Sequence, residues 1–140
     1  METIINLTFG IRSDTLDPQD VTERMGLTPA HSFRQGDKYS TKDGRILERP
    51  FGVWQVRSDG MIDSTEIEQH AQYVLSVIEP VRESLTPYLN DESIYVEIRI
   101  WCETESETGG YSLSSNIMAR LARICKAINF TYILKANDNE

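Results

Sequence analysis

The chain contains few of the residues on which catalytic and metal centres depend. Only two cysteines, Cys102 and Cys125, and two histidines, His31 and His70, occur among its 140 residues. The cysteines lack metal-ligand spacing and fall on apolar rows, so we expect buried, reduced thiols. No GxSxG, HExxH or CxxC motif accompanies either histidine, and His70 is expected on the solvated flank of a helix. These absences predict a protein that is not an enzyme and that holds no metal and no cofactor.

Positive charge and long apolar runs are also scarce. The chain has 14 lysines and arginines against 22 aspartates and glutamates, a net charge of −8. Nucleic acids are bound mainly by neutralising phosphates, so we expect no nucleic-acid partner, whereas a basic protein would be attracted. No stretch approaches the roughly 20 apolar residues that span a bilayer, and the start METIINLTFG lacks the basic lead of a signal peptide. We therefore expect a cytoplasmic protein with no membrane segment.

The chain is expected to form a single globular domain over residues 1–140, with 136–140 as a frayed tail. No linker rich in Ser, Gly or Pro interrupts it. The acidic loop Glu103, Glu105 and Glu107 lacks the pattern of an EF-hand, so we expect a solvated loop there and not a cation site.

Apolar residues at alternate positions predict the strands. They lie at 4–11, 51–57, 94–102 and 130–134, and the segment 45–49 is a candidate hairpin arm for 51–57.

Three helices are predicted from apolar spacing and end signals. The first follows an N-cap at Asp17 and stops at Gly26. The second begins with a capping box at Asp63 and Glu66 and runs to Leu89, and Pro80 is expected to kink or break it. The third starts at Ser114 or Ser115, with its apolar row reaching Ile128.

The order of these elements predicts an α+β two-layer sandwich. We expect a mostly antiparallel sheet of about four to five strands with helices on one face. Two blocks, each with a strand, an acidic loop, a helix and a strand, suggest two related β-α-β halves, ferredoxin-like in spirit.

Two surfaces are candidates for binding. Tyr95, Arg99 and Trp101 alternate along one strand and would share its outer face, which suits protein contacts better than RNA stacking in so acidic a chain. The second surface is the unperiodic stretch GLTPAHSFRQGDKY, in which a glycine, Gly36, allows positive φ and Phe33 is expected to enter the core. Either this loop is architecture held by an Arg34–Asp37 salt bridge, or His31, Arg34 and Lys38 present donors to an anion.

The quoted loop, the strand GVWQVRS, the EP within the long helix and the segment GGYSLSSNIMARLARICKAINFTYIL resemble the bacterial domain-of-unknown-function family 4279. The resemblance covers nearly the whole chain and implies a small bacterial domain with no assigned activity. Its hallmark positions, which can be structural, are Gly26, Pro29, Phe33, Arg34, Gly36, Asp37 and Trp54.

Two functions are expected from these observations, with an enzyme of unknown type as a distant third. The first is a non-enzymatic interaction module that binds another protein, as immunity proteins do. The second is a sensor that binds a small ligand or an anion through the 28–39 loop. The sequence leaves the partner and the oligomeric state open.

Overall fold

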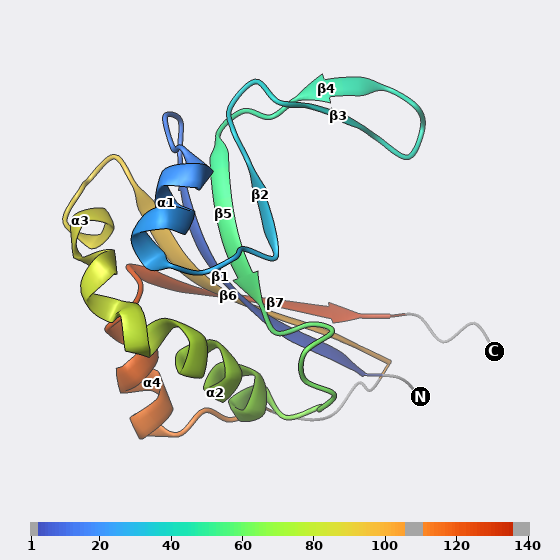
Figure 1. Ribbon diagram of the computed structural model, residues 1–140. Coiled ribbons are helices and arrows are strands. Elements are labelled where there is room, and N and C mark those ends of the chain that lie inside the picture. The colour runs from blue at the N-terminus through green and yellow to red at the C-terminus, as the bar shows by residue number, and fades with distance from the viewer. Residues whose placement is uncertain (1–2, 106–110, 136–140) are drawn as a thin grey trace.

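The alternating apolar row near the N-terminus forms the centre of the sheet. In the computed structural model, which describes residues 3–105 and 111–135, β1 (Ile4–Ser13) buries Ile5, Leu7, Phe9 and Ile11. It pairs antiparallel with β5 (Gly52–Arg57) on one side and with β6 (Tyr95–Thr104) on the other (Figure 1). The predicted strands 4–11, 51–57 and 94–102 are therefore confirmed as the three inner strands.

The two edges of the sheet differ in length and direction. β2 (His31–Phe33) pairs antiparallel with β5, and β7 (Ala127–Leu134) pairs parallel with β6, which gives the order β2-β5-β1-β6-β7. This confirms an α+β fold with a mostly antiparallel sheet. The two predicted β-α-β blocks are not equivalent, because β1 and β5 run antiparallel whereas β6 and β7 run parallel.

The expected pairing of segment 45–49 with the Trp54 strand is wrong. β4 (Ile46–Glu48) pairs instead with β3 (Lys38–Ser40), and the two form an arm that projects beyond the end of the sheet (Figure 1). The turn between them explains the difference, because Gly44 adopts φ 85° and the amide of Thr41 donates to the carbonyl of Arg45 at 2.8 Å. This turn folds β4 back onto the preceding strand, β3.

The first helix follows its predicted end signals. α1 (Pro18–Met25) begins after Asp17, whose carboxylate accepts a hydrogen bond from the amide of Gln19 at 3.0 Å. It ends at Gly26, which takes the left-handed φ of 67°.

The predicted long helix is three segments, and its predicted capping box is absent. They are α2 (Ile67–Ile78), the 3₁₀ helix η1 (Glu79–Leu85) and α3 (Thr86–Leu89), with non-helical angles at Val81. Proline at position 80 removes an amide donor and crowds the preceding turn, which breaks the ladder there. At the start, Glu66 occupies the N-cap position without a side-chain bond, and its amide donates to Oγ of Ser64.

The last helix is shorter than its apolar row. α4 (Ser115–Ala122) begins after Ser114, whose Oγ accepts from the amide of Ile117. The apolar spacing continues to Ile128, but the residues after Ala122 belong to the connection and to β7 and are not helical. β7 starts at Ala127 and not, as predicted, at Phe130.

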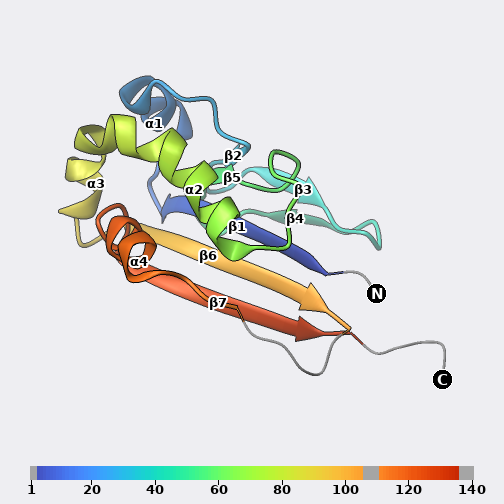
Figure 2. The ribbon, with the colours of Figure 1, turned by 90° about the horizontal axis from the view of Figure 1, so that it is seen from below.

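All helices lie on one face of the sheet, as predicted (Figure 2). The core lies between this layer and the inward row of the strands, and its largest fully buried members include Trp54, Phe9, Leu75, Ile98 and Leu121. The opposite face of the sheet is open. None of the helices in the described ranges is long and apolar enough to cross a membrane.

Candidate functional site

The open face of the sheet carries a patterned set of polar side chains, and the strand register places them. Gly10 of β1 lies opposite Gln55 of β5 and Glu97 of β6. In the next row on this face, Thr8 lies between Arg57 and Arg99. Because opposite residues in a ladder share a face, these side chains meet above the backbone of β1.

Gly10 forms the floor of a hollow of about 250 Å³ at this point. A Cβ atom added to Gly10 would lie 3.6 Å from Cγ of Gln55 and 3.9 Å from Cγ of Glu97, which is ordinary contact distance. The absent side chain therefore leaves space at the centre of the face. The charged residues that line the hollow are Arg12, Arg49, Arg57, Glu97 and Arg99, with His31 beside them.

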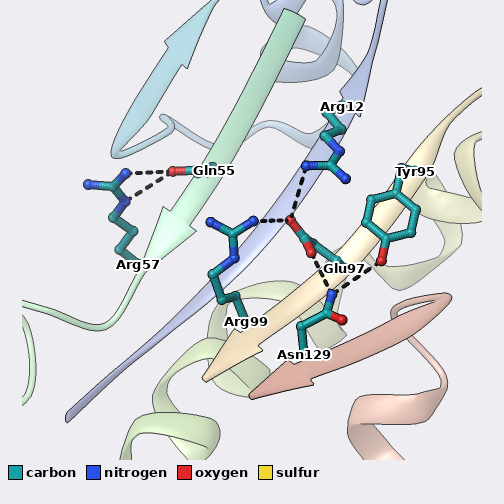
Figure 3. A network of polar contacts seen from close by, with 7 residues as sticks. All are labelled: Arg12, Gln55, Arg57, Tyr95, Glu97, Arg99 and Asn129. Atoms are coloured by element: carbon teal, nitrogen blue, oxygen red, sulfur yellow. Dashed lines mark hydrogen bonds and ion pairs between the residues drawn. The ribbon is translucent and has the colours of Figure 1, made fainter. Parts of the chain in front are cut away.

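Glu97 is the acidic member of this lining, and it is 7% exposed. Its carboxylate accepts hydrogen bonds from Nη2 of Arg99 at 3.0 Å and from Nδ2 of Asn129 at 2.7 Å, and it lies 3.9 Å from Nη1 of Arg12 (Figure 3). The Asn129 amide also donates to Oη of Tyr95 at 3.2 Å. Glu97 thus holds groups from three strands together.

Arg57 is held on the other side of the hollow without a carboxylate partner among the residues described. Its Nε and Nη2 atoms both donate to Oε1 of Gln55, at 3.0 and 2.8 Å (Figure 3). This neutral partner fixes the guanidinium and leaves its full positive charge uncompensated.

Two further arginines are held by aromatic rings. The guanidinium of Arg49 lies 4.0 Å from the ring centre of Phe33 and 3.8 Å from that of Tyr39. Within the described parts of the chain this guanidinium makes no hydrogen bond or ion pair. The guanidinium of Arg12 lies 4.5 Å from the ring centre of Tyr95 and 5.3 Å from that of Phe51. Ring faces attract cations, so these contacts order both groups while most of their N–H donors stay available.

The electrostatics of the hollow are therefore opposite to those of the whole chain. Four guanidinium groups face one carboxylate in a protein of net charge −8. The same field acts on His31, whose pKa is lowered by burial and by the nearby charges of Arg57 and Arg49. Arrangements of this kind recognise carboxylates and phosphates, because a guanidinium presents several donors in a fork that fits two oxygen atoms.

Only part of the predicted binding surface belongs to this site. His31 and Arg99 line the hollow and Tyr95 supports it, whereas Trp101 lies further along β6 and donates from Nε1 to Glu103. Lys38 is exposed at the start of the β3–β4 arm and is not part of the lining.

The predicted salt bridge in the 28–39 loop is wrong in its partner. Arg34 pairs with Asp17 at 2.7 Å, and Asp37 instead accepts from the backbone amide of Arg34 at 2.8 Å. Asp37 therefore caps the turn, which agrees with the interpretation of this loop as architecture. Gly36 in the same turn has φ 87°. The short side chain of Asp37 is committed to this cap, which leaves Asp17 as the carboxylate that Arg34 reaches.

The other hallmark positions have structural contacts. Gly26 ends α1, and Trp54 is fully buried with its Nε1 donating to Oγ1 of Thr22 at 3.1 Å. Phe33, predicted in the core, instead lies half-buried on the open face, where it packs on His31 and Arg49. The register explains this, because Phe33 pairs with Val53, which is adjacent to the core residue Trp54 and points to the other face.

His70 is buried and not on a solvated flank, which corrects the prediction for this residue. It is 1% exposed, and its Nδ1 lies 2.7 Å from Oγ of Ser58 while its Nε2 donates to the carbonyl of Ser64 at 2.7 Å. Oγ of Ser58 also accepts from the amide of Leu7 at 2.8 Å. A serine and a histidine in contact can form a nucleophile and a base, but Ser58 is 0% exposed, so this pair fastens α2 to the sheet.

Among the described residues, the cysteines and the acidic groups form no metal or redox centre. Both thiols are free: Cys102 is buried, as predicted, whereas Cys125 is half-buried, and burial raises its pKa to about 11. No cluster of three or more His, Cys, Asp or Glu side chains suited to a metal occurs within 3–105 and 111–135. Glu103 is bound by Lys135 at 2.8 Å, and Glu107 lies outside the described residues.

Sequence reasoning missed most of the hollow. Arg12, Arg49, Arg57, Gln55 and Glu97 were not among the predicted site residues, although Arg12 and Arg57 directly follow the buried residues Ile11 and Val56. Their alternation with the core row indicates the open face. The missing information was the register that brings three strands together around Gly10.

Comparisons with known proteins give the family and no function. Neither the curated proteins nor the solved structures contain a match. The model of the family described as "Domain of unknown function (DUF4279)" matches residues 3–135. This match covers nearly the whole chain and confirms the resemblance seen in the sequence, so the chain belongs to the DUF4279 family.

Proposed function

We propose that the protein is a non-enzymatic recognition domain that binds an anionic group, a carboxylate or a phosphate, in the hollow above Gly10. The observation that carries this proposal is the convergence of four arginines on one hollow that contains a single carboxylate. Like charges held close together repel one another, and a bound anion would lower that repulsion.

The arginines of the hollow are ordered before any ligand arrives. Arg57 is fixed by Gln55, Arg99 by Glu97, and Arg49 by two rings. Ordering a long side chain on binding costs conformational entropy, so groups that are already held bind an anion more tightly. Preorganised donors of this kind support recognition.

The chemistry of the lining supports binding and not turnover. Arginine keeps its proton at any physiological pH and is a poor acid or base. Serine, threonine, cysteine and lysine are absent from the described lining, and the carboxylate of Glu97 is buried and already bonded to Arg99 and Asn129. The Ser58–His70 pair lies on the buried side of the sheet. These observations favour a recognition domain over an enzyme.

A second candidate is that the anionic group belongs to another protein. The β3–β4 arm adjoins the hollow and exposes Ile46 and Leu47, which are 69% and 38% accessible. Exposed apolar side chains beside a charged hollow suit a macromolecular partner. The net charge of the whole chain would favour a basic partner. The positive charge of the hollow instead favours an acidic partner at this face. An immunity-protein-like role would be one form of this second candidate.

The test is a thermal-shift screen at low salt against sulfate, phosphate, pyrophosphate, dicarboxylates and nucleotides. We expect at least one anion to raise the Tm of the wild type and to have less effect on Arg57→Ala and Arg49→Ala. Arg82→Ala is the matched control, because Arg82 is an exposed arginine of η1 in the helical layer. If all variants responded equally, or no anion stabilised the wild type, the proposal would fail.

A further inference from the structure

The β7 edge of the sheet lacks the protection that sheet edges usually have. β7 contributes eight residues, AINFTYIL, without a charge, a proline or a glycine. The opposite edge strand, β2, has only three residues, and short length is one of the ways in which proteins guard an edge. No strand in the described part of the chain pairs with the outer side of β7. An uncharged edge of this length is a template for another strand.

The lysines that flank β7 do not guard it. Nζ of Lys126 donates to the carbonyls of Asp91 and Ile94, both at 2.7 Å, and Lys135 pairs with Glu103. Both charges are therefore turned to groups of the same chain. Charged residues at an edge oppose strand addition only where they face the incoming strand.

Large apolar side chains of β7 remain exposed beside this edge. Phe130, Tyr132 and Leu134 are 65%, 51% and 50% accessible, and they share the face of Ile100 and Cys102. An apolar hollow of about 290 Å³ adjoins them, with Met118 of α4 in its lining. The helices cover only the first part of this row (Figure 2).

We infer that β7 pairs antiparallel with β7 of a second copy of this chain, about a two-fold axis at Thr131. Residues that lie opposite one another must point to the same face, which restricts the register. With the axis at Thr131, Phe130 lies opposite Tyr132 of the other copy, and Ile128 lies opposite Leu134. The row is thus self-complementary, since aromatic residues meet aromatic ones and aliphatic residues meet aliphatic ones.

The distribution of charge also favours a second copy of this chain as the partner of β7. The edge contains no carboxylate, so two copies of a chain of net charge −8 can approach there with less repulsion than at their acidic surfaces. The pairing would continue the sheet through both molecules and place both arginine hollows on one continuous face.

The first experiment is light scattering after size exclusion over a wide concentration series. We expect the wild type to reach twice the mass of one chain, and Phe130→Lys to stay monomeric with an unchanged Tm. Ile46→Lys is the control, because it also places a lysine at an exposed apolar site but on the β3–β4 arm. A wild type that stays monomeric throughout, or a Phe130→Lys variant that still dimerises, would overturn the inference.

A crosslinking experiment tests the register. Thr131→Cys lies opposite itself across the axis, at the roughly 5 Å between Cα atoms that a disulfide requires. Ile133→Cys, on the same face, would lie about 14 Å from its counterpart. We expect oxidation to crosslink Thr131→Cys into a covalent dimer. Ile133→Cys should form no more covalent dimer than the wild type does. Crosslinking of Ile133→Cys, or its absence in Thr131→Cys, would contradict the pairing.

Discussion

The carboxylate of Glu97 lies 3.0 Å from Nη2 of Arg99, in a hollow where it is the sole acid among four arginines. Glu97 is almost fully buried, whereas the Arg99 side chain is 45% exposed. The carboxylate therefore acts as an internal anion beneath the guanidinium groups. It lowers the repulsion among them in the unliganded protein and competes with any anion that approaches from solvent.

Replacing this carboxylate by an amide should strengthen anion binding. Glu97→Gln keeps an oxygen that can accept from Arg99 and removes one negative charge. Repulsion between the carboxylate and a bound anion about 4 Å away costs about 1 kcal/mol when water screens it. Removing this repulsion corresponds to about fivefold tighter binding of sulfate. Calorimetric titration of the wild type and the variant measures the difference. Weaker binding by a folded Glu97→Gln would show that positioning of the arginines outweighs the competition.

Filling the floor of the hollow should weaken anion binding without unfolding the protein. Gly10 does not adopt the left-handed conformation that only glycine takes easily. Gly10→Ala should fold with about 0.5–1 kcal/mol more stability, since alanine restricts the unfolded chain. Gly10→Val should place two methyl groups where the anion binds.

The readouts for this pair are the Tm and the affinity for sulfate. We expect affinity to fall in the order glycine, alanine, valine while both variants stay folded. Full binding by Gly10→Val would place the anion elsewhere.

Anion binding should strengthen as the pH falls. In the free protein, burial and the charges of Arg57 and Arg49 lower the pKa of His31, so His31 is neutral near pH 7. A bound anion adds negative charge and raises that pKa, so the complex takes up a proton in the interval between the two values. Sulfate is the appropriate probe because its own charge stays constant from about pH 8 to about pH 5. Titrations across this range should show rising affinity for the wild type and a flatter profile for His31→Gln; equal profiles would refute the coupling.

The Ser58–His70 pair should matter for stability and not for binding. Ser58→Ala leaves the Leu7 amide and Nδ1 of His70 without their partner, and a buried polar group left without a partner costs about 1–3 kcal/mol. The control is Ser76→Ala, because Oγ of Ser76 bonds the carbonyl of Tyr73 on the surface. Urea unfolding should separate the two variants clearly, and sulfate affinity should stay unchanged in both. Equal unfolding midpoints would contradict the structural role.

Local signals in the sequence were sufficient for much of the fold. Alternation predicted the three inner strands, and the Asp17 cap with Gly26 predicted α1, because such signals depend on neighbouring residues alone. The errors occurred where two competing local arrangements were both compatible with the pattern of residues. Segment 45–49 pairs with β3 across the turn at Gly44, and Ser64, where the helix start was expected, instead accepts from His70 through its carbonyl.

The proposed binding site was less accessible to sequence reasoning than the fold. Tyr95 and Arg99 were identified because both lie on one strand, where the period of two shows their common face. Arg12, Arg57 and Glu97 come from three strands, and only the register of β1 with β5 and β6 brings them together. The period of two within one strand shows which residues share a face, but it does not give the pairing of one strand with the next.

Anion binding in the hollow above Gly10 is tested most directly by a nuclear magnetic resonance titration of the folded protein with sulfate, following backbone amides and arginine Nε–H groups. We expect saturable shifts at Gly10 and at the side chains of Arg57 and Arg99, with little change at Lys38 or in the helical layer. Shifts that cluster in the 34–38 turn, or an absence of saturable shifts at Gly10, would contradict the assignment of this hollow as the anion-binding site.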